Sequence, residues 1–146
     1  MVDIGIVVKD LEKSARFYTE VLGLKEVKGF TVPADKTTRF GLADNQPATV
    51  RVFVLDETAG QPGTRLKIMS FPKAPGVQPD QEYIHSTLGL SYLTLFVTDM
   101  DRAVERLNKA RVGLLGETPA PLGGGTFLTV VHDPDGNFIE LIGPSK

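Results

Sequence analysis

The stretch His132-Asp133-Pro134-Asp135-Gly136-Asn137-Phe138-Ile139-Glu140-Leu141-Ile142 decides the fold of this chain. Pro134 fixes the backbone φ angle and Asp135-Gly136 tolerates positive φ, so the middle of the stretch is predicted to be a tight turn. The flanking residues 126–131 and 138–142 are rich in β-branched and aromatic side chains, which favour strands. The stretch therefore predicts a β-hairpin.

Glu140 places a carboxylate in the middle of the second strand of this hairpin. Side chains alternate along a strand, so Ile139 and Leu141 are predicted to face one side of the sheet. Phe138, Glu140 and Ile142 are predicted to face the other side. A carboxylate between apolar neighbours is costly to bury unless it is paired, so its presence here indicates a specific role.

The sequence Asp-Pro-Asp-Gly at 133–136, followed by Ile-Glu-Leu at 139–141, resembles the closing hairpin of the glyoxalase / bleomycin-resistance / extradiol-dioxygenase family, which has the vicinal-oxygen-chelate fold. In that family each half of the protein curls a sheet into a cup, and the glutamate of the last strand is a metal ligand. Members include isomerases, dioxygenases, epimerases, thiol transferases and non-catalytic drug-binding proteins. The resemblance therefore implies a fold without implying one function.

The composition limits the class of protein. The chain has 146 residues, enough for one domain or two small modules, and 41% of them are hydrophobic and 23% charged. A formal net charge of −2 and the lack of a long apolar run argue against nucleic acid and membrane as partners. There is no cysteine, which excludes disulfides and thiolate sites, and no export signal is recognised, so we expect a cytoplasmic protein.

An internal repeat predicts two modules. Residues 3–23 have the pattern of a strand, a capping aspartate (Asp10) and a helix that ends at a glycine, and residues 93–113 repeat this pattern with Asp99 as the cap. We therefore predict an α+β fold of two tandem βαβββ modules, each a curved, mostly antiparallel sheet with a helix on its outer face. Each half has too little core alone, so the two halves should pack together.

The predicted modules span residues 1–72 and 88–146, and a proline-rich linker with little structure of its own spans residues 73–87. The remaining expectations concern short segments. They are strands at 24–30, 50–55 and 65–71, a strand or strand continuation at 37–42, a hairpin loop at 56–64, a short strand near Leu114, and a Pro-Gly loop at 119–125.

Metal-dependent members of the resembled family carry ligands at four positions on the cup faces. Matched by motif onto this chain, these positions are Asp3, Lys67, Tyr92 and Glu140, and only Glu140 fits the family's pattern. Lysine and tyrosine hold their protons near neutral pH, and zinc, nickel or iron usually binds imidazole at such sites. We therefore expect no transition metal and no other cofactor, with a hard cation such as Mg²⁺ between Asp3 and Glu140 as an alternative.

Lys67 is expected where the cation would otherwise lie, between the carboxylates of Asp3 and Glu140. In one interpretation the three side chains fix a polar or charged group of a ligand. In the other, Lys67 and Glu140 form a structural ion pair and the cup holds only side chains and water.

Further candidates for substrate binding follow from strand alternation, on the assumption that Val50, Val52 and Val54 face the helix. The full predicted set is apolar and aromatic with a few polar groups, which is typical of a small-molecule pocket. It comprises Asp3, Arg51, Phe53, Lys67, Met69, Tyr92, Thr94, Phe96 and Glu140. Core filling is the better explanation for Phe53 and Phe96.

The two histidines, His85 and His132, are expected on the surface or in loops, because neither has a partner at ligand spacing. If the linker folds over the cup, His85 would be in reach of it as a general base.

Two functions fit these observations. The first is a protein that binds a small organic molecule in the cup, without a transition metal. The second is a lyase, isomerase or dioxygenase of the glyoxalase type, with Glu140 as base or metal ligand and Lys67 as an electrophile that stabilises a developing enolate. In either case we expect a homodimer, because open curved sheets leave unpaired edges that proteins usually cover.

Overall fold

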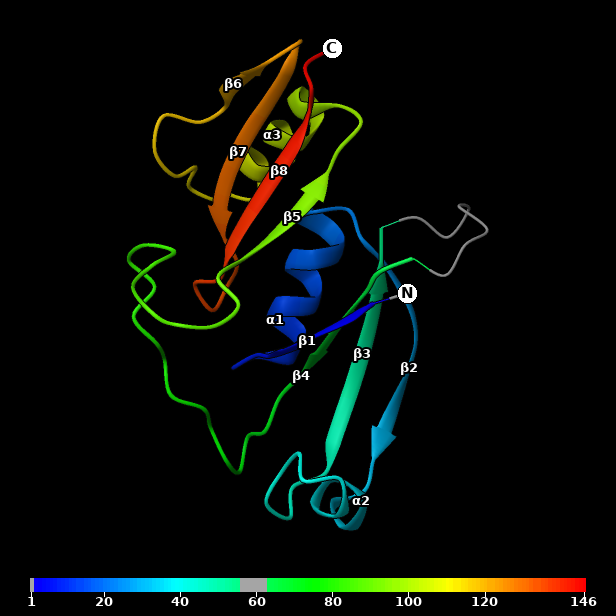
Figure 1. The fold of residues 1–146 in the computed structure, drawn as a ribbon. Coiled ribbons are helices and arrows are strands. Elements are labelled where there is room, and N and C mark those ends of the chain that lie inside the picture. Colours follow the sequence, from blue (N-terminus) through cyan, green and yellow to red (C-terminus); the bar gives the residue numbers. More distant parts are fainter. Residues whose placement is uncertain (1, 56–62) are drawn as a thin grey trace. The chain divides into compact units, whose positions relative to one another are not determined.

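The computed structural model describes residues 2–55 and 63–146, so most of the hairpin loop predicted at 56–64 lies outside the described residues. The chain divides into two compact units, Met1–Val77 and Gln78–Lys146 (Figure 1). The module and linker boundaries given above stay a prediction. Within the described residues, no helix is long and apolar enough to cross a membrane.

The first unit contains a four-stranded mixed sheet with the strand order β1-β4-β3-β2. Strands β1 and β4 are parallel, and the other neighbours are antiparallel. In chain order its elements are β1 (Asp3–Val7), α1 (Leu11–Arg16), the π-helical turn η1 (Phe17–Val21), β2 (Lys25–Val32), α2 (Ala34–Arg39), β3 (Ala48–Val54) and β4 (Arg65–Met69).

The helix of the first unit begins and ends as its sequence predicts. The Asp10 carboxylate accepts a hydrogen bond from the Lys13 backbone N–H at 2.9 Å, which caps the first turn. Gly23 has φ of 81°, which suits the residue after a helix C-terminus. The helical segment packs on the sheet through Tyr18, whose ring centroid lies 6.4 Å from that of Phe53, and both side chains are fully buried.

The predicted phase of β3 is wrong. Val50 and Val52 pair in register with Met69 and Lys67, and they are buried on the face of the sheet away from the helix. Both faces of β3 are covered, since partly buried apolar side chains such as Val27 and Phe71 pack over its valines. The valines lie on one face of β3 and Phe53 is buried on the other, so burial on both faces gives no sign of which face meets the helix.

Arg51 and Phe53 accordingly lie on the helix side of the sheet. The Arg51 guanidinium donates to Glu12 on α1 at 2.8 Å and to both carboxylate oxygens of Glu26 at 2.7 and 2.8 Å. These hydrogen bonds raise the pKa of Arg51, and the bond to Glu26 has the largest effect. The hydrogen bond from Arg51 in turn lowers the pKa of Glu26. Arg51 on β3 therefore joins α1 to the sheet and also binds Glu26 of the neighbouring strand β2.

The segment 37–42, predicted as a strand or strand continuation, is also different. It contributes to the helix α2, which follows Pro33 as the N-cap residue. Thr37 is buried, and its hydroxyl donates to the Gln46 carbonyl oxygen at 2.6 Å. The β-branched threonines suggested a strand, but this tertiary hydrogen bond and the Pro33 start favour a short helix.

The second unit repeats the arrangement of the first. Its four-stranded sheet has the order β5-β8-β7-β6, with β5 and β8 parallel and the other neighbours antiparallel. Figure 1 shows α3 along one face of this sheet. The elements are β5 (Tyr92–Phe96), α3 (Met100–Lys109), β6 (Ala120–Gly123), β7 (Thr126–His132) and β8 (Phe138–Pro144). The predicted α+β fold of tandem βαβββ modules is confirmed.

Asp99 caps α3 as predicted, accepting a hydrogen bond from the Arg102 backbone N–H at 3.1 Å. The helix ends at Lys109, before the expected end near Gly113. Leu114 forms only an isolated bridge with Val131, and the expected loop at 119–125 contains strand β6. The prolines and glycines of this segment gave no strand signal. Proline is tolerated in β6 because this strand lies at the edge of the sheet.

The closing hairpin forms as predicted and is organised by Asp133. One carboxylate oxygen accepts hydrogen bonds from the backbone N–H groups of Asp135 and Asn137, both at 2.9 Å. The other accepts from the Asn137 side-chain amide, also at 2.9 Å. Gly136 has φ of 86°, which a side chain would disfavour. This hairpin sets the start of β8 and therefore the position of Glu140.

Candidate functional site

Two of the predicted site residues, Asp3 and Lys67, come together in the first unit. Asp3 on β1 lies beside the parallel strand β4, and its Oδ2 is 2.7 Å from the Lys67 Nζ. Arg65 binds the same carboxylate with two hydrogen bonds, Nε to Oδ1 at 2.8 Å and Nη2 to Oδ2 at 2.6 Å. The Lys67 ammonium also lies 5.4 Å from the centroid of the Phe30 ring, a cation–π distance.

The Asp3 carboxylate is therefore already neutralised from two sides. The hydrogen bonds from Arg65 and Lys67 hold the pKa of its carboxyl well below the usual range, and Asp3 in turn raises the pKa of Arg65. A metal ion bound by Asp3 would meet the Lys67 ammonium and would displace an arginine from both oxygens. The donor set of the first unit does not fit a divalent metal.

We expect Asp3→Asn to lower the free energy of unfolding at pH 7 and to do so less in acid. The folded-state pKa of Asp3 is lower than its unfolded-state pKa of about 4, so its contribution is present above about pH 4 and is lost as the pH falls toward the folded value. Lys67→Met should behave in the same way, because the carboxylate found beside it is that of Asp3.

Urea unfolding of both variants between about pH 7 and pH 2 measures this difference. Lys36→Met, at an exposed position on α2, is the matched control and should show no such pH dependence. A stability difference between Asp3→Asn and the original protein that is constant over this range would contradict the assignment.

Two further predicted residues, Thr94 and Glu140, meet in the second unit. They are register partners on the parallel strands β5 and β8, and the Thr94 hydroxyl donates to the Glu140 Oε2 at 2.7 Å. The predicted phase of β5 is therefore correct at Thr94. Among the described residues of the second unit, no lysine or arginine forms an ion pair with Glu140.

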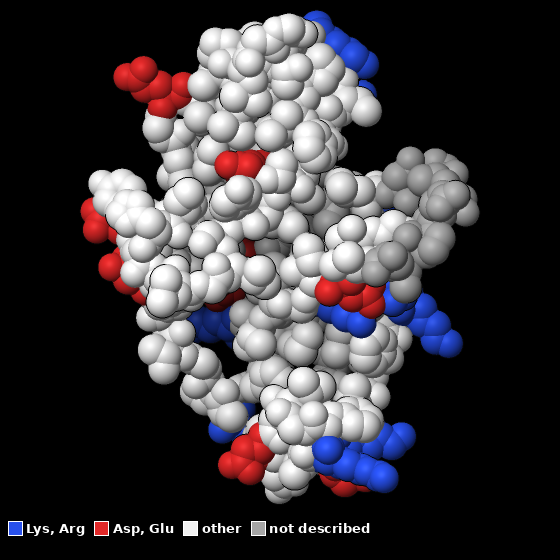
Figure 2. All heavy atoms as spheres, in the orientation of Figure 1, with Lys and Arg blue, Asp and Glu red and all other residues white. Residues whose placement is uncertain are grey.

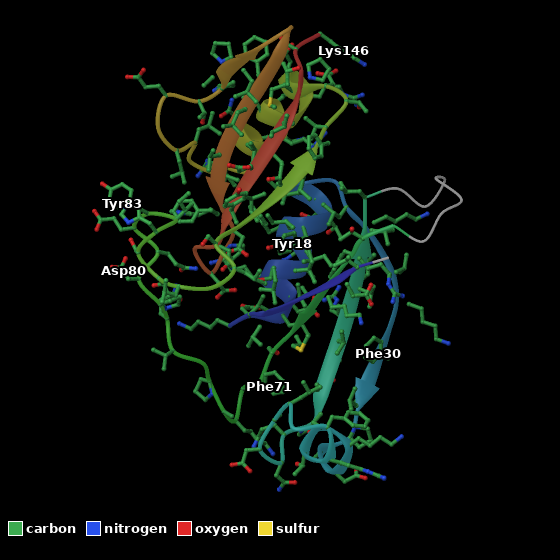
Figure 3. All side chains as sticks on the ribbon, in the orientation of Figure 1. Tyr18, Phe30, Phe71, Asp80, Tyr83 and Lys146 are labelled. Carbon is green, nitrogen blue, oxygen red and sulfur yellow. The ribbon has the colours of Figure 1, made fainter. Side chains whose placement is uncertain are left out.

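Glu140 lines a pocket of about 340 Å³ that lies entirely within the second unit. Its volume is in the range of small-molecule sites. The sheet contributes Tyr92, Val130, Phe138 and Glu140, and two loops contribute Tyr83, Ile84, His85, Leu115, Gly116 and Thr118. Figure 3 shows Tyr83 on the segment that loops beside the strands of this sheet. Tyr92 and Glu140 are thus the two predicted residues that share one pocket.

His85 is an exposed loop residue, as expected, and it also lines this pocket. Its ring stacks on the Tyr83 ring, with centroids 5.5 Å apart and an angle of 7° between the planes. In the second unit this segment brings His85 to the pocket, as in the alternative in which the linker folds over the cup. His132 lies at the end of β7, with its ring edge-on to Phe138 and its buried Nε2 without a hydrogen-bond partner among the described residues.

The other predicted residues do not line the pocket. Arg51 and Phe53 contact the helix of the first unit, and Met69 packs on the valines of β3. Phe96 is 72% exposed at the end of β5. Asp3 and Lys67 belong to the other unit, so the convergence of all four matched positions in one cavity stays a prediction.

Several pocket residues were not predicted from the sequence. Phe138 has a usable signal, because it lies two residues before Glu140 on the same strand face. Val130 requires the β7–β8 register, in which it is the partner of Glu140. Tyr83 and Ile84 belong to a proline-rich segment without periodicity, where no pattern indicates which side chains reach the sheet.

Among residues 2–55 and 63–146, no group of three or more histidine, aspartate or glutamate side chains is placed to hold a metal ion. The matched positions add an ammonium and a phenol to two carboxylates, and this set does not fit zinc, nickel or iron.

Comparison with known proteins identifies the family. A probable chloroplastic lactoylglutathione lyase of Arabidopsis thaliana is 27% identical over 92% of this chain, which spans only 33% of that relative's length. A lactoylglutathione lyase of Pseudomonas putida is 28% identical, with 94% of this chain and 81% of the relative covered. The crystal structure of a glyoxalase family protein from Bacillus cereus has the same fold, with a TM-score of 0.80 at 23% identity over 100% of this chain and 94% of that one. The family model of the glyoxalase/bleomycin resistance protein/dioxygenase superfamily matches residues 1–141, and the chain belongs to this superfamily.

Proposed function

We propose that this chain binds a small organic molecule in the pocket of its second unit, and that it does so without a transition metal. The observation that carries the proposal is the pocket itself. It has a volume of about 340 Å³, mainly aromatic and aliphatic walls, and one carboxylate, Glu140. Apolar walls with a few placed polar groups are characteristic of ligand sites.

The first unit supports the metal-free part of the proposal. Of the matched ligand positions in this unit, Lys67 binds the Asp3 carboxylate, and the neighbouring Arg65 binds it as well. The ion pairs make a stable arrangement without a metal, and a metal would have to compete with both cations for one carboxylate.

A lyase of the glyoxalase type is the second candidate function. Two groups suited to proton transfer, His85 and Glu140, line the same pocket, and the relatives described above are named lactoylglutathione lyases. Lys67, the proposed electrophile, belongs to the first unit, and its approach to Glu140 is part of this hypothesis. If the protein converts lactoylglutathione and Glu140→Gln abolishes this conversion, the lyase function is favoured. If the protein does not convert it, binding remains as the one proposed function.

A homodimer and a cytoplasmic location complete the proposal. Val7 on β1 and Phe96 on β5 are 56% and 72% exposed on edge strands, and such edges are usually covered. Light scattering at micromolar concentration distinguishes a dimer from a monomer.

Filling the pocket should abolish binding. Val130→Trp places a large side chain on the pocket wall, next to the register partner Glu140. We expect aromatic fragments that bind the original protein to bind this variant at least about tenfold more weakly. Leu122→Trp is the matched control, since Leu122 lies on β6, is 55% exposed and does not line the pocket.

Protein-detected NMR with a set of cationic, neutral and anionic aromatic fragments provides the measurement. Supporting results are shifts at Tyr92, Phe138 and Glu140 that disappear in Val130→Trp and persist in Leu122→Trp. If no fragment binds, or if Val130→Trp binds as well as the original protein, the proposed function is wrong.

A further inference from the structure

The composition of the pocket indicates which class of molecule it would take. Four of its residues carry aromatic rings, namely Tyr83, His85, Tyr92 and Phe138. The faces of tyrosine and phenylalanine rings carry negative partial charge and attract cations, and several rings around one space form the sites that bind quaternary ammonium groups. The same pocket contains the carboxylate of Glu140.

Among the described residues of the second unit, no lysine or arginine compensates the charge of the Glu140 carboxylate. Its Oε2 accepts a hydrogen bond from the Thr94 hydroxyl at 2.7 Å, and the carboxylate has no ion pair with the described residues of its own unit. An anionic ligand that covered this carboxylate would remove water from it without replacing the lost interaction, and a neutral ligand would replace at most a hydrogen bond. A cationic ligand would offset that cost directly.

The distribution of charged side chains in the second unit also favours a cationic ligand. Between residues 78 and 145, every lysine and arginine lies within 102–111, which is α3 and the two residues after it. Helix α3 packs on the face of the sheet opposite Glu140, because Thr129, the partner of Leu141, contacts Met100 at 3.2 Å. The pocket face is therefore free of basic side chains from the surrounding strands.

The loop that supplies Tyr83 adds further negative charge. Asp80 and Glu82 precede Tyr83 on this exposed segment (Figure 3). In Figure 2 the surface over β6, β7 and β8 is mostly uncharged and includes acidic side chains, and the basic side chains of this part of the surface lie near the C-terminal end. A field of one sign around a pocket raises the local concentration of ligands of the opposite sign.

The first unit shows what a compensated carboxylate looks like in this fold. There Asp3 is bound by Arg65 and Lys67, whereas among the described residues of the second unit Glu140 is bound by a threonine hydroxyl alone. We propose that the ligand of the second unit's pocket is an organic cation, an amine or quaternary ammonium compound with apolar substituents, whose charge pairs with Glu140 among the aromatic rings. This assignment rests on the proposed binding function.

Three simple aromatic probes test it: benzyltrimethylammonium (cationic), benzyl alcohol (neutral) and benzoate (anionic). We expect the cation to bind at least about tenfold more tightly than either of the others, with an affinity that falls as salt is added. Glu140→Gln should reduce the affinity for the cation to that for benzyl alcohol. Glu105→Gln, which removes a carboxylate from the exposed side of α3, is the control and should change nothing.

Tyr92→Leu provides a second variant, at a side chain that is 54% exposed and therefore tolerant of replacement. It should reduce the affinity for the cation several-fold, by about the contribution of one cation–π contact, and leave the affinity for benzyl alcohol nearly unchanged. Thermal unfolding of each variant confirms that it is folded.

The possible outcomes separate this inference from the proposed function. If benzyl alcohol or benzoate binds as tightly as the cation, or if Glu140→Gln leaves the affinity for the cation unchanged, the inference is wrong while binding in the pocket stands. If none of the probes and none of the fragments binds, the proposed function fails, and the inference fails with it.

Discussion

Asp133→Ala is expected to lower the free energy of unfolding of the second unit by about 3–5 kcal/mol. The Asp133 side chain is only 5% exposed and accepts three hydrogen bonds, two from backbone N–H groups and one from the Asn137 amide. Alanine would leave these donors unsatisfied in a turn that contains Pro134 and a positive-φ glycine. Hydrogen bonds to a charged acceptor contribute more than neutral ones, so the loss should be large.

Asp133→Asn is the matched variant. It retains one carbonyl oxygen that accepts from the Asp135 and Asn137 backbone N–H groups, but it loses the charge and the second acceptor. We expect about half of the alanine effect. Urea unfolding followed by circular dichroism gives both values, and an alanine variant within about 1 kcal/mol of the original protein would contradict the role assigned to Asp133.

Gly143→Ala should destabilise the same unit by about 2–4 kcal/mol for a different reason. A Cβ atom at residue 143 would overlap the carbonyl oxygen of Val97, which is backbone and cannot rotate away. The adjacent hydrogen bond, from the Val97 N–H to the Ile142 carbonyl at 2.8 Å, holds the end of β5 against β8. The alanine should therefore push apart the two strands that bring Thr94 to Glu140.

Gly113→Ala is the control for this change. No atom lies within 4 Å of the Cβ position at Gly113, and its φ angle is not positive. We expect this variant to unfold within about 0.5 kcal/mol of the original protein. Equal stabilities for the two alanine variants would show that the close approach at Gly143 is relieved without cost.

The fold was predictable because its strongest signals are local. Asp10 and Asp99 each begin a helix after a short apolar strand, and the Asp133 turn closes a hairpin between two β-branched segments. These patterns depend on capping and turn geometry that act within a few residues. The repeat then gives the tandem architecture without knowledge of any long-range contact.

Features that depend on tertiary contacts were not predictable in the same way. Residues 34–39 form α2, with Thr37 bonded to Gln46, and β6 forms at an edge among prolines and glycines. The face of β3 that meets the helix was misassigned, because both faces are buried, the valines on one and Phe53 on the other. In each case the deciding contact lies outside the local sequence.

The candidate site was predictable only where strand phase carried the information. Tyr92, Thr94 and Glu140 were correctly placed on one face of the second sheet, because alternation and the motif fix their phase. Tyr83 and Ile84 come from an aperiodic segment, and their approach to the sheet depends on how that segment folds. The expected approach of Lys67 to Asp3 is found across the parallel β1–β4 pair, whereas Arg65, which binds the same carboxylate, was not predicted.

Binding of aromatic fragments to chelator-treated protein tests the central claim most directly, with and without added zinc or nickel. The account predicts that fragments bind the metal-free protein in the pocket of the second unit, with the same affinity after metal is added, because Lys67 and Arg65 occupy Asp3 and Glu140 is the one carboxylate among the described residues that line the pocket. Binding that appears only after one equivalent of metal has been taken up would contradict it.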